Sequence, residues 1–306
     1  MMMNEPLVDG QSLRAPRLAI SRLRKVYEGK GRMVEAVRDV TFSLDERELV
    51  CIVGPSGAGK TTLLRCIAGL LQPTSGDITL AGRTVSGPPP GMAVVFQEYG
   101  RSLFPWMRVR QNVELPLKEK GLPASQRRKL VDESLEAVGL QDARDAYPWQ
   151  LSGGMQQRVA IARAIAYEPE VLLMDEPFAS VDAQTRAELE DLVRSLWARL
   201  GVTIVFVTHD IDESVYLGER VIVLSASPTV VMEDVRIDLG ADRNQLDTRT
   251  DPRFGQLRGR IYALIKDAKG RVEDAGASRR PEVMGDPSRA STAQTGALTE
   301  PLRRKA

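Results

Sequence analysis

A glycine-rich stretch, GPSGAGKTT at 54–62, has the residue types that can enclose a phosphate chain. It fits the pattern GxxxxGK[ST], with Gly54, Gly59, Lys60 and Thr61 at the defining positions. Glycines let backbone N–H groups close around phosphate oxygens, the lysine reaches the β and γ oxygens, and the threonine hydroxyl can bind Mg²⁺. A plain glycine-rich turn is the alternative, but a strand-like run before the motif and a helical pattern after it favour phosphate binding. We therefore predict that the chain binds a nucleoside triphosphate.

Two carboxylates, Asp175 and Glu176, directly follow the apolar run VLLM at 171–174. Because adjacent residues on a strand point to opposite faces, the two side chains should have different roles. We expect Asp175 to bind Mg²⁺ through water, and Glu176 to orient and polarise the water that attacks the γ-phosphate. Acidic pairs at strand ends often only cap helices, an alternative that the phosphate-binding pattern disfavours.

His209 is the only histidine among the 306 residues. A single histidine is often a packing residue, but this one follows the apolar run TIVFV at 203–207 and precedes DIDE. That position places an imidazole at the same sheet edge as the phosphate-binding loop, where it could hydrogen-bond the γ-phosphate. With no second histidine, the chain has no histidine cluster for a metal.

Four unbroken apolar runs must position these residues: LVCIV at 49–53, MAVVF at 92–96, VLLM at 171–174 and TIVFV at 203–207. Such runs are typical of parallel strands buried on both faces, with amphipathic helices between them. In parallel α/β sheets, ligands bind at the carboxyl ends of the strands. The groups that follow the four runs should therefore converge.

The other segments divide the chain into regions. Alternating residues at 18–44 predict an antiparallel β layer, and helical periodicity from about 100 to 166 predicts a helical subdomain between the second and third core strands. We expect a flexible N-terminus at 1–16, a nucleotide-binding domain at 17–268, and a disordered tail at 269–306, where large apolar residues are scarce.

Composition excludes several classes of protein. The 42 basic and 41 acidic residues leave a net charge of +1, which gives no footprint for nucleic acid. Cys51 and Cys66 lack CxxC spacing and read as buried thiols in a reducing compartment. The N-terminus has no secretory pattern, and no apolar stretch approaches the roughly twenty residues of a membrane span.

Six motifs in this order resemble the ATP-binding subunit of an ATP-binding cassette (ABC) transporter over roughly 18–266. The resemblance implies a P-loop NTPase fold of the ABC cassette type, with a RecA-like parallel-sheet α/β core, an N-terminal antiparallel β layer and a helical subdomain. The motifs are the phosphate loop at 54–62, Gln97, the signature LSGGMQQ at 151–157, VLLMDEP with Asp175 and Glu176, Asp182, and His209.

The signature carries a second group of backbone N–H donors, which one nucleotide site does not need. By the resemblance, two cassettes meet head to tail, and Ser152, Gly153 and Gly154 of one chain complete the ATP site of the other. One copy of each motif implies a dimer, most simply a homodimer closed by ATP. The resemblance implies that these residues contact MgATP: Tyr27, Gly54, Pro55, Ser56, Gly57, Ala58, Gly59, Lys60, Thr61, Thr62, Gln97, Ser152, Gly153, Gly154 and Asp182.

The resemblance also assigns individual roles. Tyr27 should stack on adenine, although a structural role for this tyrosine is the alternative. Gln97 should bind Mg²⁺ together with Thr61 and Asp175, sense the membrane subunit, and act in catalysis with Lys60, Glu176 and His209. The aromatic segment after Gln97, including Tyr99 and Trp106, either fills the helical subdomain or docks the membrane subunit with Trp106 as its anchor.

The segments FPW, LSGGMQQR and THDIDESVYLGERVIVLSASP resemble importers of the nitrate, sulfonate and taurine type. The resemblance implies a transport ATPase at the cytoplasmic face of the inner membrane, peripheral to a permease and served by a periplasmic solute-binding protein. The spacing from Gln97 to the Pro-Trp pair is longer than in sulfonate and taurine members, and FASVD replaces the commoner SALD, so the solute stays open. An exporter or lipid-trafficking ATPase is the alternative, followed by a soluble ABC ATPase, which the single cassette and low net charge disfavour.

Overall fold

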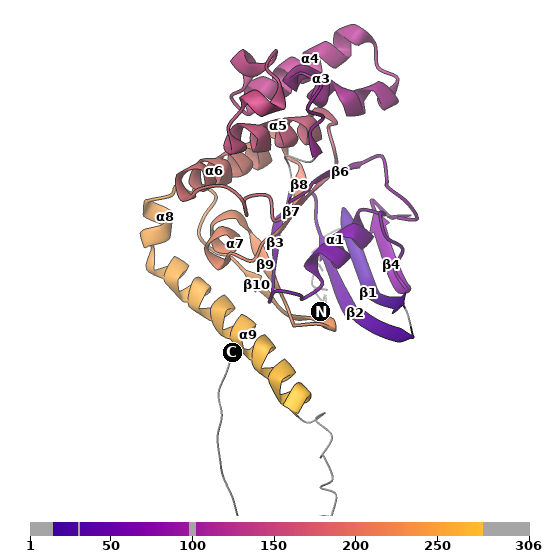
Figure 1. Ribbon diagram of the computed structural model, residues 1–306. Helices are drawn as coiled ribbons and strands as arrows, with labels where there is room; N and C mark the ends of the chain where they lie inside the picture. The colour runs from indigo at the N-terminus through magenta and orange to yellow at the C-terminus, as the bar shows by residue number, and fades with distance from the viewer. Residues whose placement is uncertain (1–14, 30, 98–101, 278–306) are drawn as a thin grey trace, which may run out of the picture.

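The computed structural model describes residues 15–29, 31–97 and 102–277, and these form one mixed sheet with helices on both faces (Figure 1). The strands are β1 (Leu18–Gly29), β2 (Arg32–Leu44), β3 (Leu49–Val53), β4 (Ser75–Leu80), β5 (Arg83–Thr84), β6 (Met92–Val95), β7 (Val171–Asp175), β8 (Thr203–Val207), β9 (Arg220–Leu224) and β10 (Thr229–Arg236). The α-helices are α1 (Lys60–Ile67), α3 (Val109–Glu114), α4 (Ala124–Ala137), α5 (Gly153–Ala166), α6 (Ala183–Leu200), α7 (Ile211–Leu217), α8 (Asp247–Thr250) and α9 (Pro252–Ala277).

The four predicted core strands are present as β3, β6, β7 and β8, and they pair in parallel in the order β3-β8-β7-β6. Alternate residues of each strand enter different cores. In β3, Cys51 packs with α5, α6 and α7, whereas Val50 and Ile52 pack with α1 and the antiparallel strands. Burial on both faces explains why these runs are apolar, apart from Thr203 at the start of β8.

A fifth parallel strand, β9, pairs with β3 and was not among the predicted runs. The run RVIVL at 220–224 carries the same signal, so its sequence could have been assigned as a strand. The antiparallel pairing of β1 with β2 confirms the predicted β layer, which β4 and β5 extend. Strand β10 pairs with both β9 and β2 and thereby joins the two halves of the sheet.

The described part of the region between β6 and β7 contains helices and turns but no strand, in agreement with the sequence pattern. It contains α3, α4, α5 and short 3₁₀ turns, and its apolar side chains join the core that covers β3, β7 and β8. Figure 1 shows these helices stacked at one end of the molecule, beyond the sheet.

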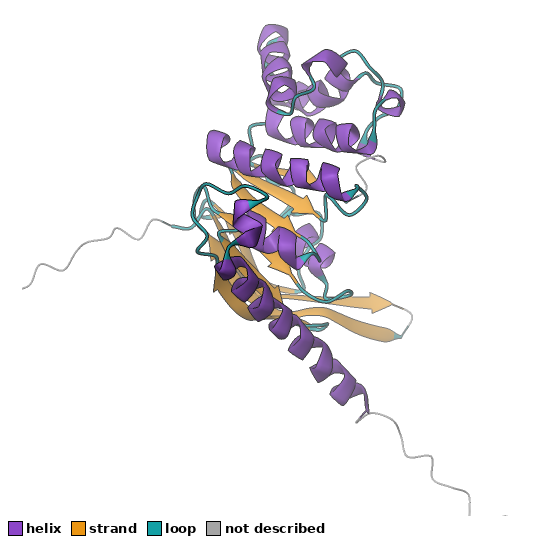
Figure 2. Cartoon of the chain, turned by 90° about the vertical axis from the view of Figure 1, so that its left-hand side faces the viewer, coloured by secondary structure: helices purple, strands orange, loops and turns teal. Residues whose placement is uncertain are grey.

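Helix α9 differs from the predicted boundary at 268/269, because it continues to Ala277 (Figure 2). Phe254 and Ile261 of α9 are buried against the cassette, so the first turns are anchored there. Residues 271–277, RVEDAGA, include good helix formers, and a helix that is already nucleated extends at little cost. The rest of the predicted tail, and nearly all of 1–16, lie outside the described residues. In the described part of the chain, no helix has both the length and the apolar character needed to span a membrane.

The two cysteines lie in the core, as expected from the sequence. Cys51 and Cys66 are both buried and unpaired. Burial raises the pKa of each thiol, to about 11 for Cys66, so both stay protonated near neutral pH.

Candidate nucleotide-binding and hydrolysis site

The glycine-rich loop follows β3 and leads into α1, the arrangement that the motif requires. Gly57 and Gly59 have φ values of 77° and 74°, in the left-handed region that glycine adopts without strain. No side chain caps α1, whose N-cap residue is Gly59. The first N–H groups of this helix are therefore free to bind an anion.

Lys60 lies inside this loop and is only 7% exposed. Its Nζ donates hydrogen bonds to the carbonyl oxygens of Gly54 at 3.1 Å and Pro55 at 3.3 Å, and it lies 3.6 Å from Oε1 of Glu176. A buried ammonium is costly without negative charge nearby. The loop thus holds a cation where phosphate oxygens would neutralise it.

Glu176 is the centre of a second group at the carboxyl ends of three strands. Its Oε2 lies 3.0 Å from Nδ1 of His209 and accepts a hydrogen bond of 3.5 Å from the amide of Gln97. Gln97 follows β6, Glu176 follows β7 and His209 follows β8. The predicted convergence of these groups is thus what the structure shows.

Asp175 is the last residue of β7 and contacts Thr61, whereas Glu176 follows the strand with a φ of 43° and contacts Gln97 and His209. Asp175 is 4% exposed and accepts a hydrogen bond of 3.4 Å from the hydroxyl of Thr61. Burial raises the pKa of the Asp175 carboxyl, and the negative charge of Glu176 adds to this, while the hydrogen bond from Thr61 opposes it. A divalent cation at this position would stabilise the ionised form.

The described residues contain no group of three or more His, Cys, Asp or Glu side chains that could hold a metal alone. Thr61 and Asp175 lie together, but Gln97 contacts Glu176. This small donor set fits Mg²⁺, which usually keeps several waters and binds to one or two protein oxygens plus phosphate oxygens. It does not fit a zinc site, which needs three or four nitrogen or sulfur ligands.

An open pocket of about 600 Å³ connects the loop to Glu176 and His209. Tyr27 lies at its margin, 40% exposed, with its hydroxyl 3.1 Å from that of Thr62. Ser227, from the turn before β10, also lines the pocket. No sequence pattern predicts the contribution of Ser227, because it depends on the tertiary position of β10. The lining is Tyr27, Val34, Ala36, Ser56, Gly57, Ala58, Gly59, Lys60, Thr61, Thr62, Glu176, His209 and Ser227.

The signature residues form a separate site, because Ser152, Gly153 and Gly154 are not among the residues that line this pocket. Ser152 is the N-cap of α5 and accepts a hydrogen bond from the backbone N–H of Met155. Ser152 and Gly153 are exposed, so this helix start faces outward. In a single chain, the backbone N–H groups at the start of α5 therefore lie outside the pocket of the chain's own phosphate loop.

Asp182 is connected to the signature by Thr185, which hydrogen-bonds Asp182 and packs against Gly154. It caps α6 by accepting hydrogen bonds from the backbone N–H of Thr185 at 3.0 Å and from its hydroxyl at 2.7 Å. These bonds hold the pKa of the Asp182 carboxyl below its usual range. A Cβ on Gly154 would lie 2.4 Å from Cγ2 of Thr185, so α5 and α6 start in close contact.

The aromatic segment after Gln97 divides between core and surface. Leu103 is buried in the main core, whereas Trp106 is 69% exposed and makes an edge contact with Phe104 at 5.4 Å between ring centres. The exposed indole does not fill the helical subdomain, which was one of the two sequence interpretations. Tyr99 lies outside the described residues.

Comparison with known proteins places the chain among transport ATPases. A family model described as "ABC transporter" matches residues 37–179. An uncharacterised ABC transporter ATP-binding protein of Methanocaldococcus jannaschii is 46% identical over 82% of this chain and 92% of its own length. The nitrate import ATP-binding protein NrtD of Synechocystis sp. is 43% identical over 85% of this chain and 99% of its own length. The taurine import ATP-binding protein TauB of Roseobacter denitrificans is 42% identical over 84% of this chain and 98% of its own length.

Solved structures agree with the fold. A dimeric structure of a post-hydrolysis state of the ATP-binding cassette MJ0796, bound to ADP and Pi, matches with a TM-score of 0.64 and 33% identity. The match covers 72% of this chain and 99% of that one. The predicted fold class is confirmed.

Proposed function

Because this chain belongs to the ABC transporter family of ATPases, we propose that it powers an importer for a small anionic solute of the nitrate, sulfonate or taurine type. The observation that carries this proposal is the meeting of Lys60, Glu176 and His209 at the carboxyl ends of three strands. The names of the nitrate and taurine import relatives support the direction of transport. In this system the chain is peripheral to a permease on the cytoplasmic side and acts with a solute-binding protein.

In the proposed reaction, the side chains at the strand ends divide the work. Lys60 exchanges its contacts with the carbonyls of Gly54 and Pro55 for phosphate oxygens. Glu176 orients the attacking water and takes its proton, a form of help typically worth about 10²–10⁴-fold. Without nucleotide, His209 and Gln97 both contact Glu176 and hold its carboxylate in position. When ATP binds, the single N–H of the neutral imidazole is donated to the γ-phosphate instead of to Glu176.

We propose that Thr61 and Asp175 hold Mg²⁺, with Gln97 as a further ligand when it turns away from Glu176. The cation supplies charge neutralisation for the β- and γ-phosphates. Asp175 binds best when ionised, so the cation offsets the cost of its burial. At the other end of the pocket, Tyr27 stacks on the adenine ring, and the hydroxyl of Thr62 holds the tyrosine in place.

Two chains form the complete enzyme in this proposal. Ser152, Gly153 and Gly154 face outward from their own phosphate loop and complete the nucleotide site of the partner, near Asp182. The dimeric cassette bound to ADP and Pi supports this arrangement. The exposed Trp106 is the proposed anchor for the permease, because a 69% exposed indole gains most from burial at an interface.

Gel filtration of two variants tests this proposal. Glu176→Gln keeps the shape of the side chain but cannot accept a proton, so turnover should fall about 10²–10⁴-fold while ATP is still bound. ATP should then trap a dimer. Adding Ser152→Arg places a bulky side chain at the outward-facing helix start, so the trapped dimer should be lost while each monomer still binds ATP.

Two results would contradict the head-to-tail arrangement: a Glu176→Gln protein that stays monomeric with ATP, or a double variant that still dimerises. Asp251→Asn is a suitable control in the Glu176→Gln background. It removes a charge from the exposed pair with Arg253, at the start of α9, and should leave the trapped dimer unchanged.

A further inference from the structure

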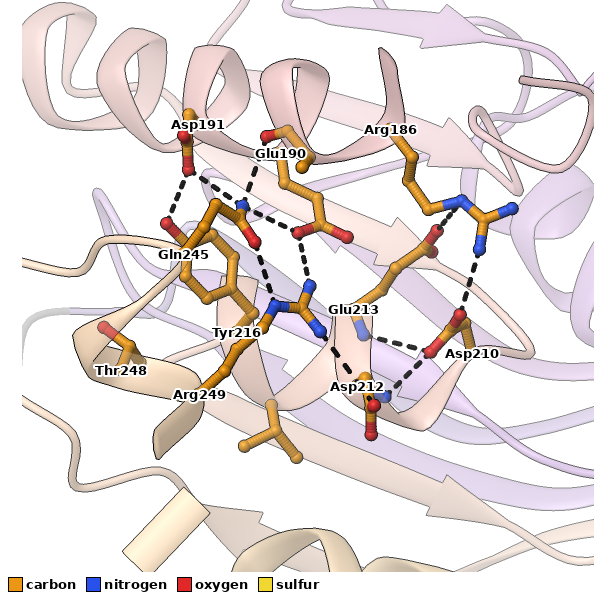
Figure 3. Close-up of polar contacts among 12 residues, drawn as sticks. Arg186, Glu190, Asp191, Asp210, Asp212, Glu213, Tyr216, Gln245, Thr248 and Arg249 are labelled. Atoms are coloured by element: carbon orange, nitrogen blue, oxygen red, sulfur yellow. Dashed lines mark hydrogen bonds and ion pairs between the residues drawn. The ribbon is translucent and has the colours of Figure 1, made fainter. Parts of the chain in front are cut away.

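Arg186 lies one turn into α6 and connects two segments that are far apart in the sequence (Figure 3). Toward the loop after Glu176, its Nη2 donates to the carbonyl of Val181 at 3.5 Å. Toward the segment after β8, its Nη1 lies 3.3 Å from Oδ2 of Asp210 and its Nε lies 3.5 Å from Oε1 of Glu213. The guanidinium thus holds the loop that carries Asp182 against the segment that carries His209.

The partners of Arg186 fix the backbone on both sides of His209. Thr208 is buried and donates a hydrogen bond of 2.6 Å to Glu213, and its Oγ1 accepts the backbone N–H of Asp210. Asp210 caps α7 by accepting the N–H groups of Asp212 and Glu213 at 2.8 and 3.2 Å. Among the described residues, the His209 side chain contacts only Glu176 in this way, and it is 57% exposed. Its position therefore depends on these two neighbours.

The first turn of α6 also contacts the start of the signature helix α5. Thr185 precedes Arg186, binds Asp182 and packs so closely on Gly154 that a Cβ there would meet it at 2.4 Å. A shift of the α5 start must therefore move the first turn of α6 as well, because close-packed contacts transmit displacement. That turn carries Arg186.

The contacts of Arg186 are long enough to change when the first turn of α6 moves. They measure 3.3 to 3.5 Å, longer than the usual 2.9 Å or so for an N–H···O bond. Its Nε is buried and has no hydrogen-bond partner within the part of the chain that the structure describes, although the carboxylate of Glu213 lies 3.5 Å away. A small displacement of α6 can shorten or break these contacts.

We propose that Arg186 is a positioning residue that couples the signature helix of a chain to its own His209. This inference rests on the proposed function, in which the signature serves the partner's nucleotide and His209 serves the chain's own. Arg186 touches neither nucleotide. It transmits the closure of one ATP site to the catalytic group of the other, so the two sites of the dimer respond together.

The test uses the full-length chain and compares Arg186→Gln with wild type. The affinity of the monomer for ATP, measured by titration with a fluorescent ATP analogue, should change less than about twofold, because Arg186 does not line the pocket. The kcat at saturating MgATP should fall about 3- to 30-fold, the range for residues that couple two sites without contacting a ligand. The Hill coefficient for ATP should fall toward one.

Two further variants separate positioning from general stability. Arg186→Lys keeps the charge and should recover part of the lost kcat. Arg220→Gln is the matched control, because Arg220 also pairs with two carboxylates, Glu48 and Asp234, but lies at the amino end of β9, away from the site. It should lower the melting temperature without changing kcat or the Hill coefficient.

The outcomes distinguish the inference from the function on which it rests. If wild type fails to hydrolyse ATP, the proposed function is wrong. If wild type hydrolyses ATP without cooperativity, or if Arg186→Gln is folded and keeps its kcat and Hill coefficient, the function stands and the coupling role is wrong. If Arg186→Gln does not fold, an unchanged Hill coefficient in Arg186→Lys and in Asp210→Asn would overturn the role, and a reduced one in both would support it.

Discussion

Replacing Glu213 by glutamine should alter how the free energy of unfolding depends on pH. The Glu213 side chain is 6% exposed and accepts the hydroxyl of Thr208 at 2.6 Å. Burial raises the pKa of this carboxyl from 4.5 to about 7, and Asp210 and Glu190 add to the rise, while the hydrogen bond from Thr208 and the charge of Arg186 oppose it. A glutamine can accept the same hydrogen bond but cannot ionise.

The sign of the effect follows from proton binding. Between pH 4.5 and about 7, the folded chain keeps a proton that the unfolded chain has released, so stability falls as the pH rises through this window. One pKa unit corresponds to 1.36 kcal/mol, so the difference between the unfolded value of 4.5 and the folded value of about 7 corresponds to about 3 kcal/mol in the free energy of unfolding. Between pH 5 and pH 8, wild type should therefore lose about 2 to 3 kcal/mol relative to Glu213→Gln.

Urea unfolding of both proteins at pH 5 and pH 8, without nucleotide, measures this difference directly. Glu188→Gln controls for the loss of one negative charge, because Glu188 is an exposed residue on α6. Parallel pH dependences in wild type and Glu213→Gln would refute the reasoning, and would mean that the carboxylate stays ionised in the folded chain through its pairing with Arg186.

Three other predictions concern the nucleotide, the permease and the tail. Lys60→Ala should weaken MgATP binding by about 10- to 100-fold, the usual value of a charge-assisted hydrogen bond, and unchanged affinity in a titration would contradict the assignment of the phosphate loop. Trp106→Ala should weaken association with the permease by about 2 kcal/mol or more without changing the ATPase activity of the free chain, and a lowered melting temperature instead would indicate a packing role. A chain ending at Ala277 should keep its ATPase activity and dimerisation, because it retains all of the described helix α9; aggregation or loss of activity on truncation would show that 278–306 are required.

The strands and the phosphate loop could be predicted because their signals are local. An unbroken apolar run, as in β3, β7 and β8, is found by reading neighbouring residues, and so is the glycine spacing of the loop. The run of β9 carried the same signal and was missed. The helix over 269–277 departs from the predicted disorder for a different reason. The segment has few large apolar residues, but helical propensity extends a helix that is anchored upstream.

The supporting network around His209 could not be predicted from sequence. Arg186 and Glu213 carry no motif spacing of their own, and their meeting depends on how α6 packs beside α7. The same holds for Ser227, which reaches the pocket only because β10 lies between β2 and β9. Sequence patterns thus identified the groups proposed for the chemistry, while the groups that hold them required coordinates.

Strand β10 has one more consequence, because it makes the sheet continuous from Tyr27 on β1 to the loop after β3. A hydrogen-bonded sheet resists internal sliding, and the bond from Tyr27 on β1 to Thr62 on α1 adds a second tie between the antiparallel strands and the phosphate loop. The separation between the proposed base-stacking ring and the phosphate loop is therefore set before any ligand arrives. For a nucleotide bound as proposed, this preorganisation lowers the entropic cost of binding. A shorter anion such as pyrophosphate would reach the phosphate loop without reaching the tyrosine, so the proposed site would favour a ligand of nucleotide length.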